Sequence, residues 1–419
     1  MLFFSRLMHF TQPKMHLTLL QIVCFFIRFY TQAIKTQGLL ANISHATQEN
    51  IMKIRQIVQI LILAVGFSFS SCKYKDEMDT VKSLKKISDG VFFLEYEGDY
   101  GFDEYLAQGG SRNTDELTKF LTNQLTKGKW NASKDKTMKE VKITPVDFGC
   151  SSFVIKNSEK PEQMLFGRNY DWKNCQVLIV HTKPDNGYES ISTCCLSHIG
   201  IGEDWEPSGK FLKDVFALAA IYVPMDGMNE KGLYIADLIA GGSKEEATVQ
   251  ERGNICVTTT DAIRMVLDKA ANVDEALELL QTHDMHSVIG RAHHFAIADA
   301  SGKSVAVEWV NNEMFVKESN MLTNHYITDS PKKDNGTNPE TENSRIRFST
   351  LKGGWEKAEG LMTPAEVADT LQSVCIAQYR TEEWDEGMTV WSAVFEPANQ
   401  KISYFFRENY DKKYEFELK

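Results

Sequence analysis

One cysteine and two charged residues occur at a spacing that could form a nucleophilic site. Cys150 is followed 18 and 21 residues later by Arg168 and Asp171. That spacing predicts a strand, a turn and a returning strand, which would place both charged side chains close to the thiol. A neighbouring guanidinium lowers the pKa of a thiol, and a nearby carboxylate can hold an ammonium or orient a proton carrier. The alternative is a buried, apolar Cys150 beside an ordinary ion pair of the hairpin.

Three further segments follow Cys150 along the chain: Asp226–Leu233, Leu322–Asn324 and Asn343–Phe348. Together with Cys150 and Phe166–Trp172 they resemble the choloylglycine hydrolase family of linear amide C–N hydrolases, which includes bile salt hydrolases and penicillin V acylases. The likeness extends more distantly to the N-acylethanolamine acid amidase and acyl-CoA:6-aminopenicillanate acyltransferase group. It covers roughly Cys150 to Lys419, and its motifs are specific in combination rather than singly.

The resemblance implies a cysteine N-terminal nucleophile mechanism, in which the chain is cut before Cys150 and the freed α-amine is the base for its own thiol. An α-amine has an ordinary pKa of about 7.7–8.0, so a usable fraction is neutral near neutral pH and can accept the thiol proton. Gly149 suits self-cleavage because glycine tolerates strained backbone geometry. Gly149–Cys150 is therefore the predicted scissile bond, and neither a separate catalytic histidine nor a cofactor is required.

The resemblance also assigns roles to five residues. Cys150 would be the nucleophile, Arg168 would stabilise its thiolate, and Asp171 would hydrogen-bond the new α-amine. Asn324 would donate its side-chain amide to the oxyanion, a contact of the kind worth about 2.7–4 kcal/mol; a strand-end residue bonded to its own backbone is the alternative. Arg345 is expected at the edge of the site, with a solvated arginine in a charged helix start as the alternative.

Asp237 and Ile239 are the predicted substrate-binding residues. The segment Asp226–Leu233 is interpreted as a tight turn, with Gly232 at positive φ, that leads into a strand. Bile salt hydrolases carry an Asn a few residues after this turn, within a Gly-Leu-Asn run. Here Ile239 stands where that Asn is expected and Asp237 replaces a Gly. This departure argues against a true bile salt hydrolase and leaves open both the substrate and the second oxyanion donor.

The chain before Cys150 divides into three predicted parts. Residues 52–72 are typical of an export signal, with a basic start, an apolar run too short for a membrane span and a small-residue end. That end resembles a loose bacterial lipobox and predicts lipidation of Cys72; a simple secretory peptide is the alternative. Residues 1–51 are interpreted as a misassigned extension or leader, or as containing a second hydrophobic, membrane-associated segment over Leu17–Phe29. Residues 73–149 form a predicted pro-segment with a helix near Asn113–Lys127.

The composition is that of an exported globular enzyme. Hydrophobic residues make up 42% and charged residues 25% of the chain, and residues 150–419 suit one large catalytic domain. A formal net charge of −11 argues against nucleic-acid binding. The expected partner is a small-molecule N-acyl amide, and the expected location is the periplasm or cell envelope of a bacterium. Membrane anchoring through a lipid on Cys72 and a homo-oligomer are left open.

Histidines and cysteines suggest two other kinds of site. His283, His286, His293 and His294 lack the HExxH spacing and a paired carboxylate turn, so no metal is predicted, and His293 and His294 are expected to open a strand. The eight cysteines have no regular framework spacing, so a disulfide is compatible with export without being implied. Adjacent Cys194 and Cys195 are expected to be strand residues.

The resemblance implies an α+β fold, the four-layer αββα sandwich of the N-terminal nucleophile hydrolases. Alternation and helical spacing of apolar residues predict elements that suit two sheets with outer helices. The expected strands are Ser152–Lys156, Gln176–Thr182, Val215–Val223, Gly232–Leu238, Phe295–Asp299, Ser304–Val310, Thr389–Phe395 and Ile402–Phe406. The expected helices are Thr260–Ala271, Val273–His283 and Pro364–Ile376.

The leading hypothesis is a thiol amidohydrolase that cleaves the linear amide of an N-acylated small molecule through an acyl-enzyme on Cys150. An acyltransferase, in which an amine resolves the acyl-enzyme, is the alternative within catalysis. A third hypothesis is an exported lipoprotein that keeps the fold as a binding module. The joint presence of Cys150, Arg168, Asp171 and Asn324 favours an enzyme.

Overall fold

The computed structural model describes residues 75–126, 150–241, 247–331, 339–376 and 387–419, which all lie in the unit Lys75–Lys419. The predictions for residues 1–51, for the export signal with Cys72, and for Gly149 fall outside the described residues. Within the described ranges, no helix is long and apolar enough to cross a membrane.

The larger sheet has nine strands in the order β1-β2-β5-β6-β7-β8-β11-β12-β13. Most neighbours are antiparallel, and β2 and β5 pair in parallel. The strands are β1 Lys85–Ser88, β2 Val91–Glu97, β5 Val177–Lys183, β6 Ser190–Cys195, β7 Asp226–Asn229, β8 Tyr234–Ile239, β11 His293–Ala298, β12 Ser304–Val310 and β13 Glu313–Glu318. A separate parallel pair is formed by β9 Ile255–Thr258 and β10 His283–His286.

The smaller sheet has seven strands in the order β14-β3-β4-β16-β17-β18, with β15 also paired to β3. Its strands are β3 Cys150–Asn157, β4 Met164–Lys173, β14 Met321–Leu322, β15 Leu361–Met362, β16 Gly387–Glu396, β17 Lys401–Phe406 and β18 Tyr414–Glu417.

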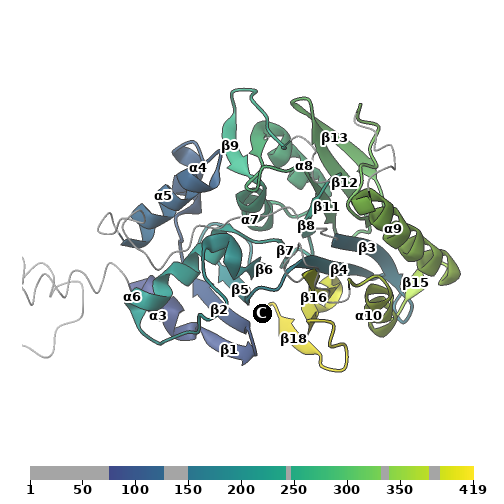
Figure 1. The fold of residues 1–419 in the computed structure, drawn as a ribbon, viewed down its shortest axis with the longest axis horizontal. Coiled ribbons are helices and arrows are strands. Elements are labelled where there is room, and N and C mark those ends of the chain that lie inside the picture. The colour runs from purple at the N-terminus through teal and green to yellow at the C-terminus, as the bar shows by residue number, and fades with distance from the viewer. Residues whose placement is uncertain (1–74, 127–149, 242–246, 332–338, 377–386) are drawn as a thin grey trace, which may run out of the picture. The chain divides into compact units, whose positions relative to one another are not determined.

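Helices cover the outer faces of the two sheets (Figure 1). On the nine-stranded sheet lies α7 Thr259–Lys269, which packs on β7 and β8, and α8 Val273–Thr282 packs on α7. On the seven-stranded sheet, α10 Pro364–Ser373 packs on β4 and β16, while α9 Pro339–Lys357 packs on β3 and β14. The predicted α+β fold with four layers is confirmed.

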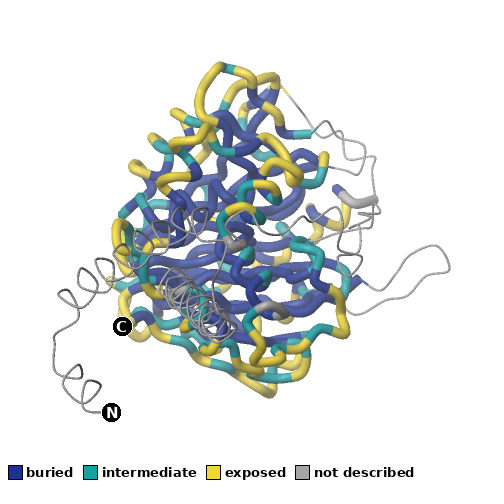
Figure 2. The backbone as a smooth tube through the Cα atoms, turned by 90° about the vertical axis from the view of Figure 1, so that its left-hand side faces the viewer, coloured by how far each residue is buried: buried dark blue, intermediate teal, exposed yellow. Residues whose placement is uncertain are grey.

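The two sheets face each other across the main hydrophobic core, which Figure 2 shows as the buried strands of this unit. Tyr234 of β8 contacts the rings of Phe166 and Phe395 from the other sheet. Its hydroxyl also lies 2.9 Å from Ser152 Oγ. Burying aromatic rings removes a large apolar area from water, so these contacts stabilise the packing that holds β3 and β4 against β8.

The three predicted helices are confirmed as α7, α8 and α10, and each begins at a residue that caps it. Thr258 accepts the amide of Asp261, and Asn272 accepts that of Glu275. Thr363 and Glu366 form a reciprocal capping box at the start of α10. Such side chains satisfy amide groups that have no partner inside the helix.

The predicted strand Val215–Val223 is wrong. These residues form the 3-10 helix η3 Val215–Tyr222, which follows the short helix α6 Phe211–Asp214. The segment is apolar along its whole length, and a buried helical segment gives the same unbroken apolar pattern as a buried strand. The turn before β8 is as predicted, since Gly232 has φ 76°.

Residues 75–126, which fall within the predicted pro-segment, fold onto the same core. They form α3 Lys75–Ser83, β1, β2, α4 Phe102–Ala107 and α5 Thr114–Thr126. The helix expected near Asn113–Lys127 is therefore confirmed as α5. β2 pairs with β5, and the apolar residues of β2 are buried. Among them, Phe92 is fully buried and packs on the ring of Trp205.

Two cysteines form a disulfide that the sequence did not imply. Cys175 follows β4 and is bonded to Cys195, the last residue of β6. Cys194 and Cys195 are strand residues, as predicted, and Cys194 is a buried free thiol. The disulfide ties the end of β4 to the larger sheet.

Candidate active site

Cys150 and Arg168 lie on the two strands of one hairpin, as their spacing predicted. Cys150 is the first residue of β3, and β3 pairs antiparallel with β4 so that Cys150 is opposite Tyr170 and Ser152 is opposite Arg168. Alternate residues of a strand share a face. Cys150 and Arg168 therefore lie on the face that looks toward the nine-stranded sheet.

Arg168 is a fully buried cation that joins the two sheets. Its Nε lies 3.3 Å from Asp226 Oδ2, and its Nη2 donates to the carbonyl of Asp237 at 2.6 Å. Trp391 Nε1 donates to the same Asp226 oxygen at 2.8 Å. Burial lowers the pKa of Arg168, but the charges of Cys150 and Asp226 raise it by more, so the net shift of the pKa is upward. The guanidinium stays charged beside the thiol.

Burial and the charge of Arg168 act on the Cys150 thiol in opposite directions. Burial raises the pKa of Cys150, and Arg168 is the largest influence that lowers it; a backbone hydrogen bond from Asp171 also lowers it. The net pKa lies above the ordinary value in the continuous chain. Thiolate formation therefore depends on the guanidinium and on a base that takes the proton.

Replacing Arg168 with Gln is expected to raise the pKa of the Cys150 thiol, because the charge that most lowers it is lost. The pH dependence of Cys150 alkylation by iodoacetamide, followed by peptide mass, measures this shift. Arg168→Lys is the control, since it keeps the charge, and its alkylation curve should stay closer to wild type. Coincident curves for all three folded proteins would contradict the assignment.

Asp171 approaches Cys150 at the end of β4 from the opposite face of that strand. Its Oδ1 accepts the hydroxyl of Thr389 at 2.6 Å, whereas its buried Oδ2 has no hydrogen-bond partner among the described residues. Burial raises the pKa of Asp171 to about 7, and the charge of Arg347 and the Thr389 hydrogen bond oppose that rise. A buried carboxylate oxygen without a donor is suited to an ammonium close by.

Asn324 directly contacts the amide of Cys150. Its Oδ1 accepts Cys150 N–H at 2.6 Å and Arg347 Nη2 at 2.8 Å, while its Nδ2 donates to the carbonyl of Ile239 at 2.9 Å. Asn324 is thus placed beside Cys150, as expected, rather than bonded to its own backbone. One of its two amide hydrogens holds Ile239, and an amide group has a second hydrogen to donate.

The arginine that contacts Cys150 is Arg347, for which no role was predicted, and the role expected of Arg345 stays a prediction. Arg345 is exposed, whereas Arg347 is buried and donates through Nη1 to the Cys150 carbonyl at 2.6 Å and to Ser151 Oγ at 2.9 Å. Both belong to α9, where residues two apart point about 200° away from each other. The buried series Ser344, Arg347 and Leu351 has helical spacing, so an analysis of this periodicity could have selected Arg347.

The predicted substrate-binding residues line a pocket at Cys150. The pocket has a volume of about 370 Å³ including its open mouth, and its walls include Asp237, Ile239, Tyr170 and Trp172. Asp237 and Ile239 alternate on β8 and so share one face of that strand. His293, for which no role was predicted, also lines this pocket.

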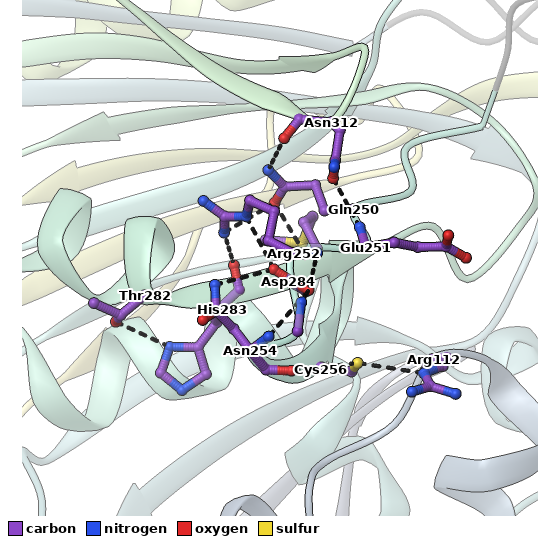
Figure 3. Close-up of polar contacts among 12 residues, drawn as sticks. Arg112, Gln250, Glu251, Arg252, Asn254, Cys256, Thr282, His283, Asp284 and Asn312 are labelled. Atoms are coloured by element: carbon purple, nitrogen blue, oxygen red, sulfur yellow. Dashed lines mark hydrogen bonds and ion pairs between the residues drawn. The ribbon is translucent and has the colours of Figure 1, made fainter.

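The four histidines considered for a metal lie in different surroundings. His283 Nδ1 contacts Thr282 and the carbonyl of Leu279 at the end of α8. The next residue, Asp284, accepts a hydrogen bond from Arg252 (Figure 3). His293 contacts Asp237 and His294 contacts Glu308. No group of three or more His, Cys, Asp or Glu suited to a metal occurs within the described ranges.

Comparisons with known proteins show which family this chain resembles. Residues 211–411 match the family model of acyl-coenzyme A:6-aminopenicillanic acid acyl-transferase. The predicted family resemblance is confirmed. The matched residues include Asn324 and Arg347 and begin after Cys150 and Arg168. The family model does not cover residues 150–210, so the assignment of Cys150, Arg168 and Asp171 to the site rests on the geometry described above.

Proteins to which the chain is similar include three from bacteria. Penicillin V acylase of Pectobacterium atrosepticum is 23% identical over 204 residues, which are 45% of this chain and 51% of that protein. The chain thus spans about half the length of this curated relative. A conjugated bile acid hydrolase structure from Clostridium perfringens is 16% identical and covers 64% of this chain and 92% of its own, with TM-score 0.47. Penicillin V acylase from Agrobacterium tumefaciens is 17% identical, covers 61% and 83%, and has TM-score 0.41.

Proposed function

We propose that this protein is a cysteine N-terminal nucleophile amidohydrolase, which cleaves linear C–N amide bonds of N-acylated small molecules after the chain is cut at Gly149–Cys150. The observation that carries the proposal is the position of Cys150. Its backbone nitrogen lies 2.6 Å from Asn324 Oδ1, and its thiol lines a pocket that it shares with Asp237 and Ile239. A cut before Cys150 would therefore create an α-amine inside the site.

In the proposed reaction, the α-amine of Cys150 takes the proton of its own thiol, and Sγ attacks the carbonyl carbon of the amide. Arg168 favours the thiolate, and Asn324 donates an amide hydrogen to the oxyanion. The C–N bond breaks as the α-ammonium returns its proton to the leaving amine. Water then attacks the thioester, which releases the carboxylic acid and restores the thiol.

Asp171 has a part in this cycle that its surroundings support. An ammonium at Cys150 would supply the donor that the buried Asp171 Oδ2 lacks. Its positive charge would also lower the pKa of Asp171 from the value of about 7 in the continuous chain. The carboxylate and the ammonium would then hold each other in the charged forms.

An acyltransferase is the second candidate, because the family model that matches residues 211–411 is that of an acyl-transferase. The chemistry differs only in the last step, where an amine rather than water attacks the acyl-enzyme. We further propose that the protein acts outside the cytoplasm, either free or anchored through a lipid on Cys72. The Cys175–Cys195 disulfide supports export, since disulfides persist in oxidising compartments.

The proposed function is tested with a panel of amides. A glycine-conjugated bile salt, penicillin V, an N-acyl amino acid and an N-acylethanolamine are incubated with wild-type protein and with Cys150→Ala, each with and without an added amine. At least one amide is expected to yield its free acid with wild type only. A new amide of the added amine would identify a transferase, and equal turnover by Cys150→Ala would refute cysteine catalysis.

A further inference from the structure

His293 and Asp237 form a buried pair in the wall of the Cys150 pocket. His293 Nδ1 lies 2.9 Å from both carboxylate oxygens of Asp237. Since Asp237 can only accept when it is ionised, the hydrogen on Nδ1 is donated to it. The carboxylate thereby fixes the orientation of the ring, and the other ring nitrogen, Nε2, is left for a different partner.

The Nε2 atom of His293 has no hydrogen-bond partner within the part of the chain that the structure describes, although the residue is only 2% exposed. A buried polar atom without a partner destabilises the folded protein. Such atoms are rare in folded proteins, and one in the wall of a pocket is suited to a bound ligand. His293 and Cys150 both line this pocket.

The strand register places Asp237 and His293 on the same face of the nine-stranded sheet. On β8, Asp237 and Ile239 alternate, and His293 of β11 is directly opposite Ile239. The carbonyl of Asp237 accepts Arg168 Nη2 at 2.6 Å. Asp237 therefore connects the cation beside the thiol to the imidazole in the pocket wall.

The other cationic groups near the pocket already have partners. Arg168 contacts Asp226 and the Asp237 carbonyl, and Arg347 contacts Cys150, Ser151 and Asn324. Arg168 Nη1 has no partner among the described residues, but Arg168 does not line the pocket. His198 also lines the pocket, but burial and the nearby His293 lower its pKa to about 4. His293 is thus the group in this wall whose second nitrogen can bind an acidic group of a ligand.

The surrounding charges favour an anionic ligand over a neutral one. Arg168 is paired with Asp226, whereas Arg347 donates to neutral groups of Cys150, Ser151 and Asn324, so buried positive charge is present near the pocket. With a carboxylate on each side, the ring of His293 would donate from both nitrogens. A ligand carboxylate would also balance the buried positive charge.

We propose that His293, held by Asp237, binds a carboxylate on the amine half of the substrate. The inference rests on the proposed amidohydrolase function and specifies its substrate class. N-acyl amino acids and similar amides with an acid on the leaving amine are the preferred substrates, and neutral amides such as N-acylethanolamines are disfavoured. Asp237 is a positioning residue in this account, because it acts through the imidazole.

The test compares phenylacetylglycine with phenylacetylglycinamide, two amides of the same size that differ in one charge. Their aromatic acyl group suits the side of the pocket formed by Tyr170 and Trp172. Wild type is expected to favour phenylacetylglycine over phenylacetylglycinamide in kcat/KM by at least about tenfold, which is the size of a hydrogen bond to a charged group. In His293→Gln the ratio should fall to about one, chiefly through KM, and Asp237→Asn should lower it in part.

His294→Gln is the matched control, because His294 is the next residue of the strand, points to the other face and contacts Glu308. It should keep the wild-type ratio. A wild-type ratio near one, or a ratio that His293→Gln leaves unchanged, would overturn the inference and leave the amidohydrolase proposal intact.

A binding measurement separates the two proposals. Calorimetric titration of both amides into Cys150→Ala, with and without His293→Gln, should show that phenylacetylglycine binds more tightly than phenylacetylglycinamide. This preference should be lost in the variant that also carries His293→Gln. If wild type hydrolyses neither amide but this preference is present, the proposed reaction fails and the anion site stands. If Cys150→Ala binds neither amide or binds both equally, the anion site is refuted.

Discussion

Replacing Arg347 with Gln is expected to lower kcat/KM by about a hundredfold and to slow the cut at Gly149–Cys150. The guanidinium donates to the Cys150 carbonyl, to Ser151 Oγ and to Asn324 Oδ1. Its loss would leave the Cys150 carbonyl and Ser151 Oγ without this donor and would remove one of the hydrogen bonds that hold Asn324 in place beside the nucleophile. Misplacement of a reacting group by about 1 Å costs on the order of a hundredfold in rate. Steady-state hydrolysis and the fraction of cut chain on a denaturing gel measure both effects.

Arg345→Gln is the matched control, because it removes the same charge from an exposed position two residues earlier on α9. Surface substitutions usually change stability by no more than about 0.5 kcal/mol, and activity and cutting should stay close to wild type. A large loss in Arg345→Gln with normal activity in Arg347→Gln would support the role expected of Arg345 and contradict the site described here.

Phe92→Ala is expected to lower the free energy of unfolding by about 3–5 kcal/mol, as large-to-small changes of buried Phe do. Phe92 lies on β2, is fully buried and packs edge-to-face on Trp205. Because β2 is hydrogen-bonded to β5 along its length, residues 75–126 should also stay bound after the chain is cut before Cys150. Denaturant titration measures the first effect, and gel filtration of cut protein measures the second.

The control for this prediction lies on the same strand. Glu97 is exposed at the end of β2, and Glu97→Ala should change the free energy of unfolding by no more than about 0.5 kcal/mol. Cut wild-type protein should elute as one complex and separate into two fragments only in denaturant. Separation of the fragments under native conditions would show that the β2–β5 pairing does not hold them together.

The hairpin of the site was predictable, because its charges and its thiol lie at a spacing that a strand pair imposes. Cys150, Arg168 and Asn324 are close together as expected. Arg345 was chosen from a motif rather than from the helical period that buries Arg347. The strand assigned to Val215–Val223 was wrong since an unbroken apolar run has no period to separate a helix from a strand.

The pair formed by Asp237 and His293 could not be predicted from spacing. The two residues lie on strands that are adjacent only because β8 and β11 pair across the helices that separate them in sequence. Asp237 was noticed as a departure from a motif, and His293 as one of several histidines. Tertiary pairing alone shows that the carboxylate and the imidazole belong to one wall of the pocket.

The position of the cut is the most direct test of the central claim, since the α-amine of Cys150 exists only if the chain ends there. Intact mass and N-terminal sequencing of purified wild-type protein, beside Cys150→Ala, measure it. The account predicts a wild-type chain that begins at Cys150 and a mutant that remains uncut after Gly149. A catalytically active wild-type chain that retains Gly149 before Cys150 would contradict it, because the proposed base would be absent.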